Sequence, residues 1–162
     1  EATRAAIETD FGVRALYHGA DMTKPGEIAL MIETAQSQLG SVDILVNNAG
    51  AAWSAPFDQL TESGWDKVVD LNLKAPFFLT RELTTLLKAG ARNDHPAKVI
   101  NIASIEGLSP SPMMGIYSMT KAAVIMMTKA LAKELGISRA GLIMKVDKYG
   151  LDKRKLARPG AA

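Results

Sequence analysis

The spacing of apolar residues along the chain changes repeatedly between a helical and an extended pattern. Apolar residues recur at helical spacing in four stretches, which are residues 2–9, 23–39, 74–87 and 116–135. Shorter apolar runs predict strands at residues 13–18, 42–46 and 98–104. The second and third of these runs are almost continuously apolar, which is typical of strands that are buried on both faces of a parallel sheet.

Strands that alternate with long helices predict an α/β domain built on a parallel sheet, with right-handed crossovers that cover both faces. Gly40, Gly90 and Gly136 stand where three of the helices should end. The chain shows neither an internal repeat nor a linker before residue 140, so we expect one domain over 1–140. Residues 141–162 form an atypical basic tail.

Composition excludes several classes of function. The 162 residues contain no cysteine, which excludes disulfides, thiolate metal sites and cysteine nucleophiles and fits a reducing cytoplasm. No apolar run is long enough to span a membrane, and the start lacks a signal-peptide pattern. A net charge of +2 gives no argument for nucleic acid, and we interpret the late lysines and arginines as a solvated tail. His18 and His95 have no partner motif, so no metal site is expected.

Candidate chemistry lies where the strands end, because ligands of open α/β sheets bind beyond the carboxyl ends of the strands. Asp21 follows the first predicted strand, the turn Asn47-Asn48-Ala49-Gly50 follows the second, and Ser104 ends the third. Tyr117 begins the next predicted helix. We therefore expect these residues to face one crevice.

Tyr117 and Lys121 are four residues apart, which places them on one face of a helix with Cβ atoms about 5–6 Å apart. An ammonium beside a phenol favours the phenolate and so prepares the phenol for acid-base work. Ser104 could hold a substrate oxygen while a hydride moves between carbon and a nicotinamide. Such a Tyr and Lys pair is common by chance, and its meaning comes from the combination with Ser104 and the Asn-Asn-Ala-Gly turn.

Together, Asn47 to Gly50, Asn72, Ser104 and the pair Tyr117-x-x-x-Lys121 resemble the short-chain dehydrogenase/reductase family over residues 1–136. The resemblance implies a Rossmann-like, doubly wound fold and an NAD(P)-dependent oxidoreductase. It makes Tyr117 the catalytic acid or base and Ser104 the group that orients the substrate oxygen. Lys121 would favour the phenolate and bind the nicotinamide ribose, and Asn72 would anchor a proton-relay water.

The resemblance also implies residues that contact the cofactor. These are Asp21, Met22, Asn48, Ala49 and Gly50, together with Tyr117 and Lys121. Two of the assignments have a plain structural alternative, because Asn72 could be a capping or turn residue and Asp21 a helix N-cap before Thr23. Both roles can coexist in either residue.

Within the family, the nearest subgroup resembles 3-oxoacyl-[acyl-carrier-protein] reductases of the rhamnolipid-associated type, which favours NADP over NAD. This rests on Trp53 and the segments 63–68 and 99–102. Sugar, polyol and steroid dehydrogenases share the same framework. Met113 and Met114 could line an acyl-chain path or merely fill space, whereas Met119, Met126 and Met127 are expected to pack within the fold.

Both ends of the chain depart from the family pattern. The first strand, the glycine-rich turn that receives the pyrophosphate and the second strand are missing, and the stretch 137–146 only partly resembles the expected strand. We therefore interpret the sequence as incomplete, with an end that is truncated, frame-shifted or divergent. This chain alone should bind NAD(P)H weakly or not at all, which a fluorescence titration would check.

Two further expectations concern the class of protein and its assembly. A non-catalytic Rossmann-type module or an inactive fragment is the alternative to an enzyme. The resemblance further implies that the helices at 74–87 and 117–135 pair across a two-fold axis, which would make the full-length parent a homodimer or homotetramer. Apolar residues on more than one face of both helices fit this pairing, although packing within one chain would explain them too.

Overall fold

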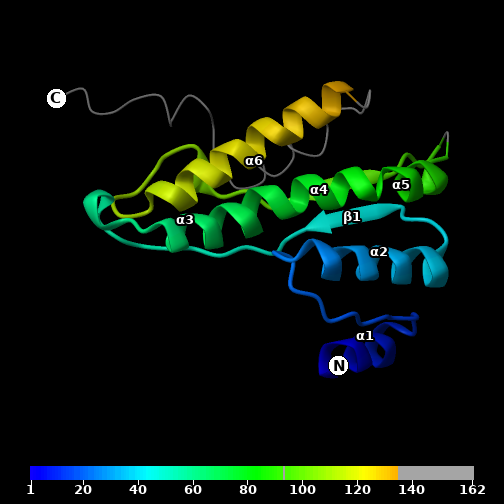
Figure 1. Cartoon of the computed structure of the whole chain (residues 1–162). Helices are drawn as coiled ribbons and strands as arrows, with labels where there is room; N and C mark the ends of the chain where they lie inside the picture. Colours follow the sequence, from blue (N-terminus) through cyan, green and yellow to red (C-terminus); the bar gives the residue numbers. More distant parts are fainter. Residues whose placement is uncertain (93, 135–162) are drawn as a thin grey trace.

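The computed structural model of the chain describes residues 1–92 and 94–134 (Figure 1). The predicted helix end at Gly136, the strand-like stretch 137–146 and the basic tail at 141–162 lie outside these residues. None of the helices in the described part is long and apolar enough to cross a membrane.

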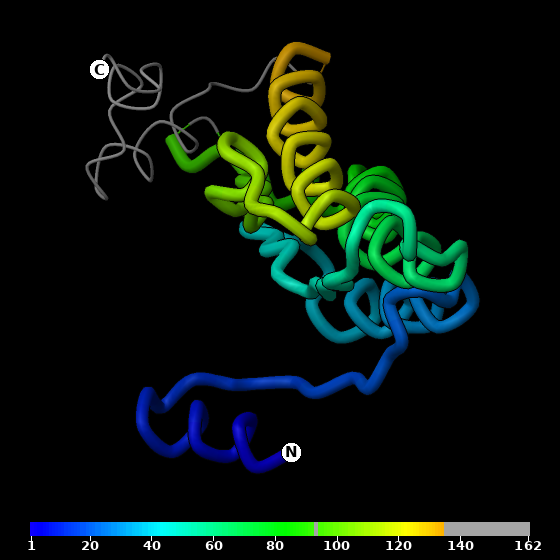
Figure 2. Tube along the Cα trace, turned by 90° about the vertical axis from the view of Figure 1, so that its left-hand side faces the viewer, coloured from blue at the N-terminus to red at the C-terminus, as the bar shows by residue number. Residues whose placement is uncertain are grey.

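The chain begins with helix α1 (Ala2–Phe11), as predicted, and Gly12 ends it in a left-handed conformation with φ of 63°. It then runs extended to α2 (Pro25–Leu39), so that α1 stands apart from the other helices (Figure 2). The predicted strand at 13–18 is wrong. A strand needs a neighbouring strand for its backbone hydrogen bonds, and the described residues place none beside it. Side chains hold this segment to α2 instead, through Arg14 on Gln38 and His18 on Thr34.

Two parallel strands form the sheet of the described residues, β1 (Ile44–Asn47) and β2 (Lys98–Asn101). Leu45 lies beside Val99, and Asn47 lies beside Asn101. The α/β class and the parallel pairing are thus confirmed, although both strands are shorter than predicted.

The crossover between the two strands is helical over most of its length. After η1 (Phe57–Gln59) come α3 (Glu62–Val69), the π-helical turn η2 (Asp70–Lys74), α4 (Ala75–Glu82) and α5 (Thr84–Gly90). Thr61 caps α3, because its hydroxyl accepts a hydrogen bond from the Gly64 amide. The predicted helix at 74–87 is confirmed but begins earlier. A π-turn inserts a residue and shifts the helical phase, so the apolar pattern looks continuous only after Lys74.

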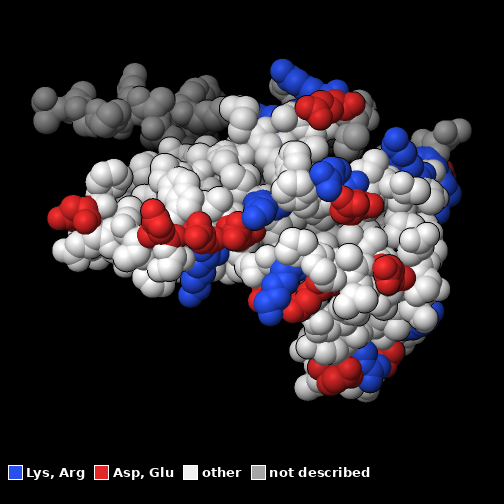
Figure 3. Space-filling model, viewed as in Figure 1, with Lys and Arg blue, Asp and Glu red and all other residues white. Residues whose placement is uncertain are grey.

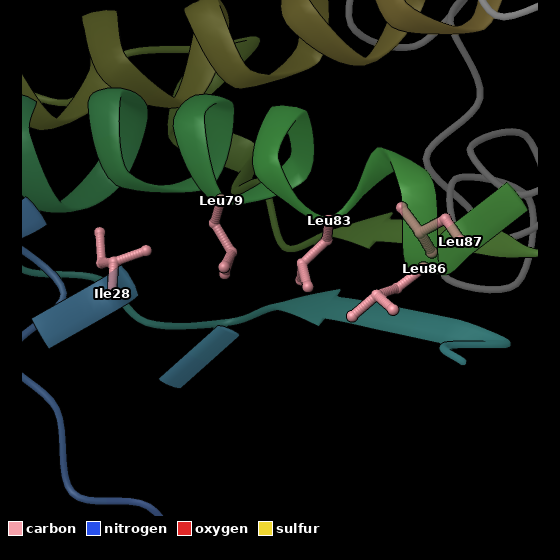
Figure 4. Close-up of a cluster of buried hydrophobic side chains, with 5 residues drawn as sticks. All are labelled: Ile28, Leu79, Leu83, Leu86 and Leu87. Atoms are coloured by element: carbon pink, nitrogen blue, oxygen red, sulfur yellow. The ribbon is translucent and has the colours of Figure 1, made fainter. Parts of the chain in front are cut away.

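The core lies between α2, the crossover helices and one face of the sheet (Figure 4). Ile28 of α2 points toward Leu79 and Leu83 of the crossover, and all three side chains are buried. Leu45 and Val99 supply the sheet side of this cluster. Burial of these side chains stabilises the fold by roughly 1.5–3 kcal/mol each.

The opposite face of the sheet is open in the described residues. Ile44, Val46 and Ile100 are 55%, 52% and 41% exposed. The described residues therefore cover one face of β1 and β2, because α2, α4 and α5 all contribute to the cluster on that face.

Helix α6 (Gly115–Glu134) follows η3 (Ile105–Gly107) and packs on η3, α3 and η2. Met127 is buried in this packing, as predicted. The same prediction is wrong for Met119 and Met126, which are 48% and 63% exposed because they lie on a face of α6 that these elements leave uncovered. Basic and acidic side chains are interspersed over the face drawn in Figure 3.

Candidate active site

Lys121 lies within α6 and is almost fully buried, with 5% of its surface exposed. Its Nζ atom donates a hydrogen bond to the Ile102 carbonyl, just beyond β2, at 2.8 Å. The same nitrogen lies 5.6 Å from the centre of the Tyr117 ring. Burial lowers the pKa of the Lys121 ammonium below its ordinary value, because the charged form loses hydration. The structure therefore places an amine beside the Tyr117 phenol, as the spacing predicted.

Asn72 lies in the π-helical turn η2 and is 2% exposed. Its amide bonds both backbone groups of Ala51, accepting from the N–H at 2.8 Å and donating to the carbonyl at 2.9 Å. It also donates to the Thr120 hydroxyl at 3.0 Å. The residue is thus neither a cap nor a surface turn asparagine. It holds the segment after the Asn-Asn-Ala-Gly turn against α6.

Gly50 stands where this turn approaches the two buried side chains. A Cβ atom at this position would lie 3.3 Å from Asn72 Oδ1 and 3.7 Å from Lys121 Nζ. Glycine avoids this crowding, so the turn can lie directly against the Asn72 and Lys121 side chains. Gly50, Asn72 and Lys121 therefore adjoin one another, although they come from three separate segments.

Ser104 follows β2 and caps η3. Its Oγ atom accepts a hydrogen bond from the Glu106 amide at 3.2 Å. Gly107 lies so close to α6 that a Cβ atom there would be 2.6 Å from the Lys121 carbonyl carbon. Ser104 thus belongs to a segment that packs on α6 at the turn holding Tyr117 and Lys121. Convergence of its hydroxyl and the Tyr117 phenol on one substrate atom stays a prediction.

A polar bridge connects the two strand ends that carry these residues. Asn47 donates to Asn101 Oδ1 at 2.7 Å and to the Thr80 hydroxyl at 3.1 Å. Asn101 in turn donates to the Thr128 hydroxyl of α6 at 2.9 Å. Because β1 and β2 are locked in this register, the turn after Asn47 and the segment leading to Ser104 keep a fixed relation.

The residues expected on the adenosine side of a cofactor separate into two groups. Met22, Asn48 and Ala49 line a largely apolar open cleft of about 350 Å³ between α2, β1 and α4. Asp21 does not line this cleft. Its carboxylate accepts hydrogen bonds from the Thr23 hydroxyl at 2.7 Å and the Thr23 amide at 3.0 Å, which lower its pKa. The alternative that Asp21 is the helix N-cap is wrong, because Lys24 is the N-cap of α2 and Asp21 forms a local turn before it. Contact of Asp21 with the cofactor stays a prediction.

The residues present fit the ribose end of the nicotinamide cofactor that the sequence resemblance implies. The Lys121 amine can donate a hydrogen bond to a ribose hydroxyl, and the Gly50 turn lies beside that amine. The cleft beside Met22 is lined mainly by side chains of the hydrophobic core. None of the described turns has the glycine-rich pattern that receives a pyrophosphate. The part of the chain that the structure describes contains no group of three or more His, Cys, Asp or Glu side chains that could hold a metal ion.

Sequence reasoning missed several residues that build this site. Thr120, Ala51 and Ile102 hold the amide of Asn72 and the amine of Lys121. Ala51 and Ile102 act through backbone atoms, which leave no trace in the side-chain pattern. Thr120 could have been suspected, because it lies next to Lys121 and three residues after Tyr117.

The sequence of this chain is similar to those of known proteins. The pattern of the short chain dehydrogenase family matches residues 1–144. A D-beta-hydroxybutyrate dehydrogenase from Cupriavidus necator is 37% identical over 135 residues, which is 83% of this chain and 51% of that protein. A rhamnolipids biosynthesis 3-oxoacyl-[acyl-carrier-protein] reductase from Pseudomonas aeruginosa is 42% identical over 95 residues, covering 58% of this chain and 37% of the reductase.

Solved structures agree with the sequence matches. L-sorbose reductase from Gluconobacter frateurii, complexed with NADPH and L-sorbose, superposes with a TM-score of 0.77 at 30% identity, over 83% of this chain and 49% of that one. The 3-ketoacyl-(acyl-carrier-protein) reductase from Brucella melitensis, complexed with NADH, gives 0.73 at 32% identity, over 83% and 56%. The chain spans about half the length of the curated relatives it matches first.

Proposed function

Because the chain belongs to the short-chain dehydrogenase family, we propose that its residues carry out the interconversion of a carbonyl and an alcohol with a nicotinamide cofactor. The observation that carries this proposal is the Lys121 amine, buried between the Tyr117 ring, Gly50 and Asn72. Burying an ammonium is costly, and a chain that needed only its fold would be served by an apolar residue at this position.

In the proposed reaction, Tyr117 donates its phenolic proton to the substrate oxygen during reduction and takes it back during oxidation. Ser104 donates its hydroxyl proton in a hydrogen bond to the same oxygen, which fixes the carbonyl for attack. A reduced nicotinamide, when bound beside Lys121, would supply the hydride for the carbonyl carbon. Lys121 favours the phenolate form of Tyr117 and binds the ribose, and the Asn72 segment anchors the water that returns the proton.

For the substrate, we propose a 3-oxoacyl or 3-hydroxyacyl compound. Three of the similar proteins named above are a 3-hydroxybutyrate dehydrogenase and two 3-oxoacyl reductases. Met113 is 51% exposed in the loop before α6, and its carbonyl accepts a hydrogen bond from Ala55, so this loop borders the segment after Gly50. A flexible thioether at such a rim suits an acyl chain. A sugar remains the second candidate, because L-sorbose reductase shares the fold.

The cofactor proposed is NADP or NAD, with NADP favoured by the resemblance to the rhamnolipid-associated reductases. The similar structures include one complex with NADPH and one with NADH.

The proposal is tested by supplying the complete protein with NADPH or NADH and a 3-oxoacyl thioester, a 3-oxo acid or L-sorbose. We expect loss of the reduced-nicotinamide absorbance with at least one 3-oxoacyl substrate, and formation of the 3-hydroxy product. Turnover of L-sorbose alone would favour the sugar reading. Absence of turnover with every carbonyl would favour a non-catalytic module.

We also propose that the protein acts as a homodimer or homotetramer. An apolar groove lies between the continuous run α3–η2–α4 and helix α6. Val69 and Phe77 line it on one side, and Met127 lines it on the other. Phe77 and Phe78 pack edge to face and are still 42% and 37% exposed. Pairing these helices with a second copy would bury this surface.

A further inference from the structure

Glu106 lies two residues after Ser104, and its carboxylate gathers hydrogen bonds from two other segments. It accepts from the Ser111 amide at 2.8 Å, from the Ser111 hydroxyl at 2.6 Å and from the Ser118 hydroxyl at 2.9 Å. Ser118 is 5% exposed and adjoins Tyr117 in α6. The carboxylate therefore joins η3, the following loop and α6.

While the carboxylate of Glu106 bonds Ser111 and Ser118, its backbone amide bonds Ser104. Its amide donates to Ser104 Oγ, which occupies an acceptor position of that hydroxyl and leaves the hydroxyl proton available for a substrate oxygen. Glu106 thus bonds directly to Ser104 and, through Ser118, to the residue beside Tyr117. These two bonds connect the segment of Ser104 with the helix of Tyr117, beside the direct bond from Lys121 to the Ile102 carbonyl.

The packing of η3 on α6 makes this connection stiff. A Cβ atom at Gly107 would collide with the backbone of Lys121 and Ala122, so η3 packs directly against α6 at this point. The hydrogen bonds from Ser111 and Ser118 also lower the pKa of the Glu106 carboxyl, so it accepts as a carboxylate at neutral pH. Hydrogen bonds to an ionised acceptor are stronger than neutral ones.

We propose that Glu106 is a positioning residue that sets the Ser104 hydroxyl relative to the Tyr117 phenol by bridging η3 to Ser118 of α6. The proposal rests on the function proposed above and adds to it a residue that need not touch substrate or cofactor. Without the bridge, Ser104 would sample more orientations, and fewer of them would meet a carbonyl oxygen that Tyr117 can protonate.

The test compares Glu106→Ala, Glu106→Gln and Ser118→Ala in the complete protein. An amide can still accept from the Ser118 hydroxyl and the Ser111 amide through its oxygen, while its NH₂ group donates to the Ser111 hydroxyl. Glu106→Ala should therefore lower kcat by about 10–100-fold, with the KM for NAD(P)H little changed. Glu106→Gln should retain most of the activity. Adding Ser118→Ala to Glu106→Ala should lower kcat little further, because both remove the same bridge.

Glu33→Ala, which removes an exposed carboxylate of α2, serves as the matched control and should leave kcat unchanged. Unchanged kcat in Glu106→Ala would overturn the proposal. A loss in Glu106→Gln equal to that in Glu106→Ala would also overturn it, because the effect would then follow charge rather than hydrogen bonding.

Amide exchange separates this proposal from the proposed function. The amides of Glu106 and Ser111 should exchange faster in Glu106→Ala than in the wild type, whether or not any substrate is turned over. A wild type that reduces no carbonyl would count against the proposed function alone. Equal exchange rates in the two proteins would count against the bridge alone.

Discussion

Lys121 shows how one side chain connects the fold to the chemistry. Its side chain is buried beside α6. Its Nζ atom donates a hydrogen bond to the Ile102 carbonyl and lies 5.6 Å from the centre of the Tyr117 ring. Loss of hydration on burial lowers its pKa from the ordinary value of 10.5. The protein therefore carries an amine whose charge is less favourable in the folded state than in the unfolded chain.

This burial predicts how stability depends on pH. Between the lowered pKa and 10.5, the unfolded chain binds more protons at Lys121 than the folded protein, so the free energy of unfolding rises with pH in that window. Below the lowered pKa, Lys121 is protonated in both states, so the stability gained at higher pH from its neutral form is lost. In Lys121→Met the contribution is absent at every pH. Urea unfolding across the alkaline range should therefore show the wild type gaining stability relative to the variant as pH rises, and parallel pH profiles would contradict the assignment.

At the scale of elements, the close approach of η3 to α6 decides where Ser104 lies. A Cβ atom at Gly107 would lie 2.6 Å from the Lys121 carbonyl carbon and 2.8 Å from the Ala122 nitrogen. Both are backbone atoms, which cannot move aside as the end of a flexible side chain can. The site is thus assembled by packing of one short turn on one helix.

Gly107→Ala should consequently destabilise the protein by about 1–3 kcal/mol, because overpacking forces η3 away from α6. It should also reduce activity, since Ser104 moves with η3. Gly26→Ala is the matched control. Nothing lies within 4 Å of a Cβ atom there, and alanine in α2 should stabilise by up to about 1 kcal/mol. Equal free energies of unfolding for the two variants would show that the Gly107 contact is not tight.

Sequence patterns predicted those elements that a clear pattern of apolar side chains marks. The helical periods of α2 and α6 and the apolar runs of β1 and β2 could be recognised because each follows from its own side chains. The apolar pattern at 13–18 predicted a strand wrongly, because a strand also needs a partner strand, and the pattern of one segment does not show whether a partner lies beside it. The π-turn η2 escaped notice because it changes the helical phase rather than the composition.

The residues of the candidate site likewise include some that a sequence pattern reveals and some that it does not. The neighbourhood of Tyr117 and Lys121 was predictable from their spacing on one helix, and the position of Ser104 beyond a strand was predictable from the apolar run before it. The backbone partners Ala51 and Ile102 were not, because every residue carries the same amide and carbonyl.

At the scale of the whole molecule, two apolar surfaces stay exposed in the described residues. One is the open face of the sheet with Ile44, Val46 and Ile100, and the other is the groove beside Phe77 and α6. Exposed apolar patches of this kind mark surfaces that pack against other chains or segments. The proposed assembly of the protein concerns the groove.

Phe77→Glu should shift the complete protein from a dimer or tetramer to smaller species, because burying an unpaired carboxylate in the interface is costly. Light scattering measures the mass directly. Phe57→Glu is the matched control, because Phe57 is 87% exposed on η1 and does not line the groove. A monomeric wild type, or an unchanged mass for Phe77→Glu, would reject this interface.

The most direct measurement is the turnover of the Tyr117→Phe variant of the complete protein on the best carbonyl substrate. The change removes one hydroxyl and keeps the ring that lies 5.6 Å from Lys121 Nζ, so the fold should be preserved. If Tyr117 supplies the proton, kcat should fall by at least about 100-fold with the circular dichroism spectrum unchanged. A folded Tyr117→Phe protein with the turnover of the wild type would contradict the account.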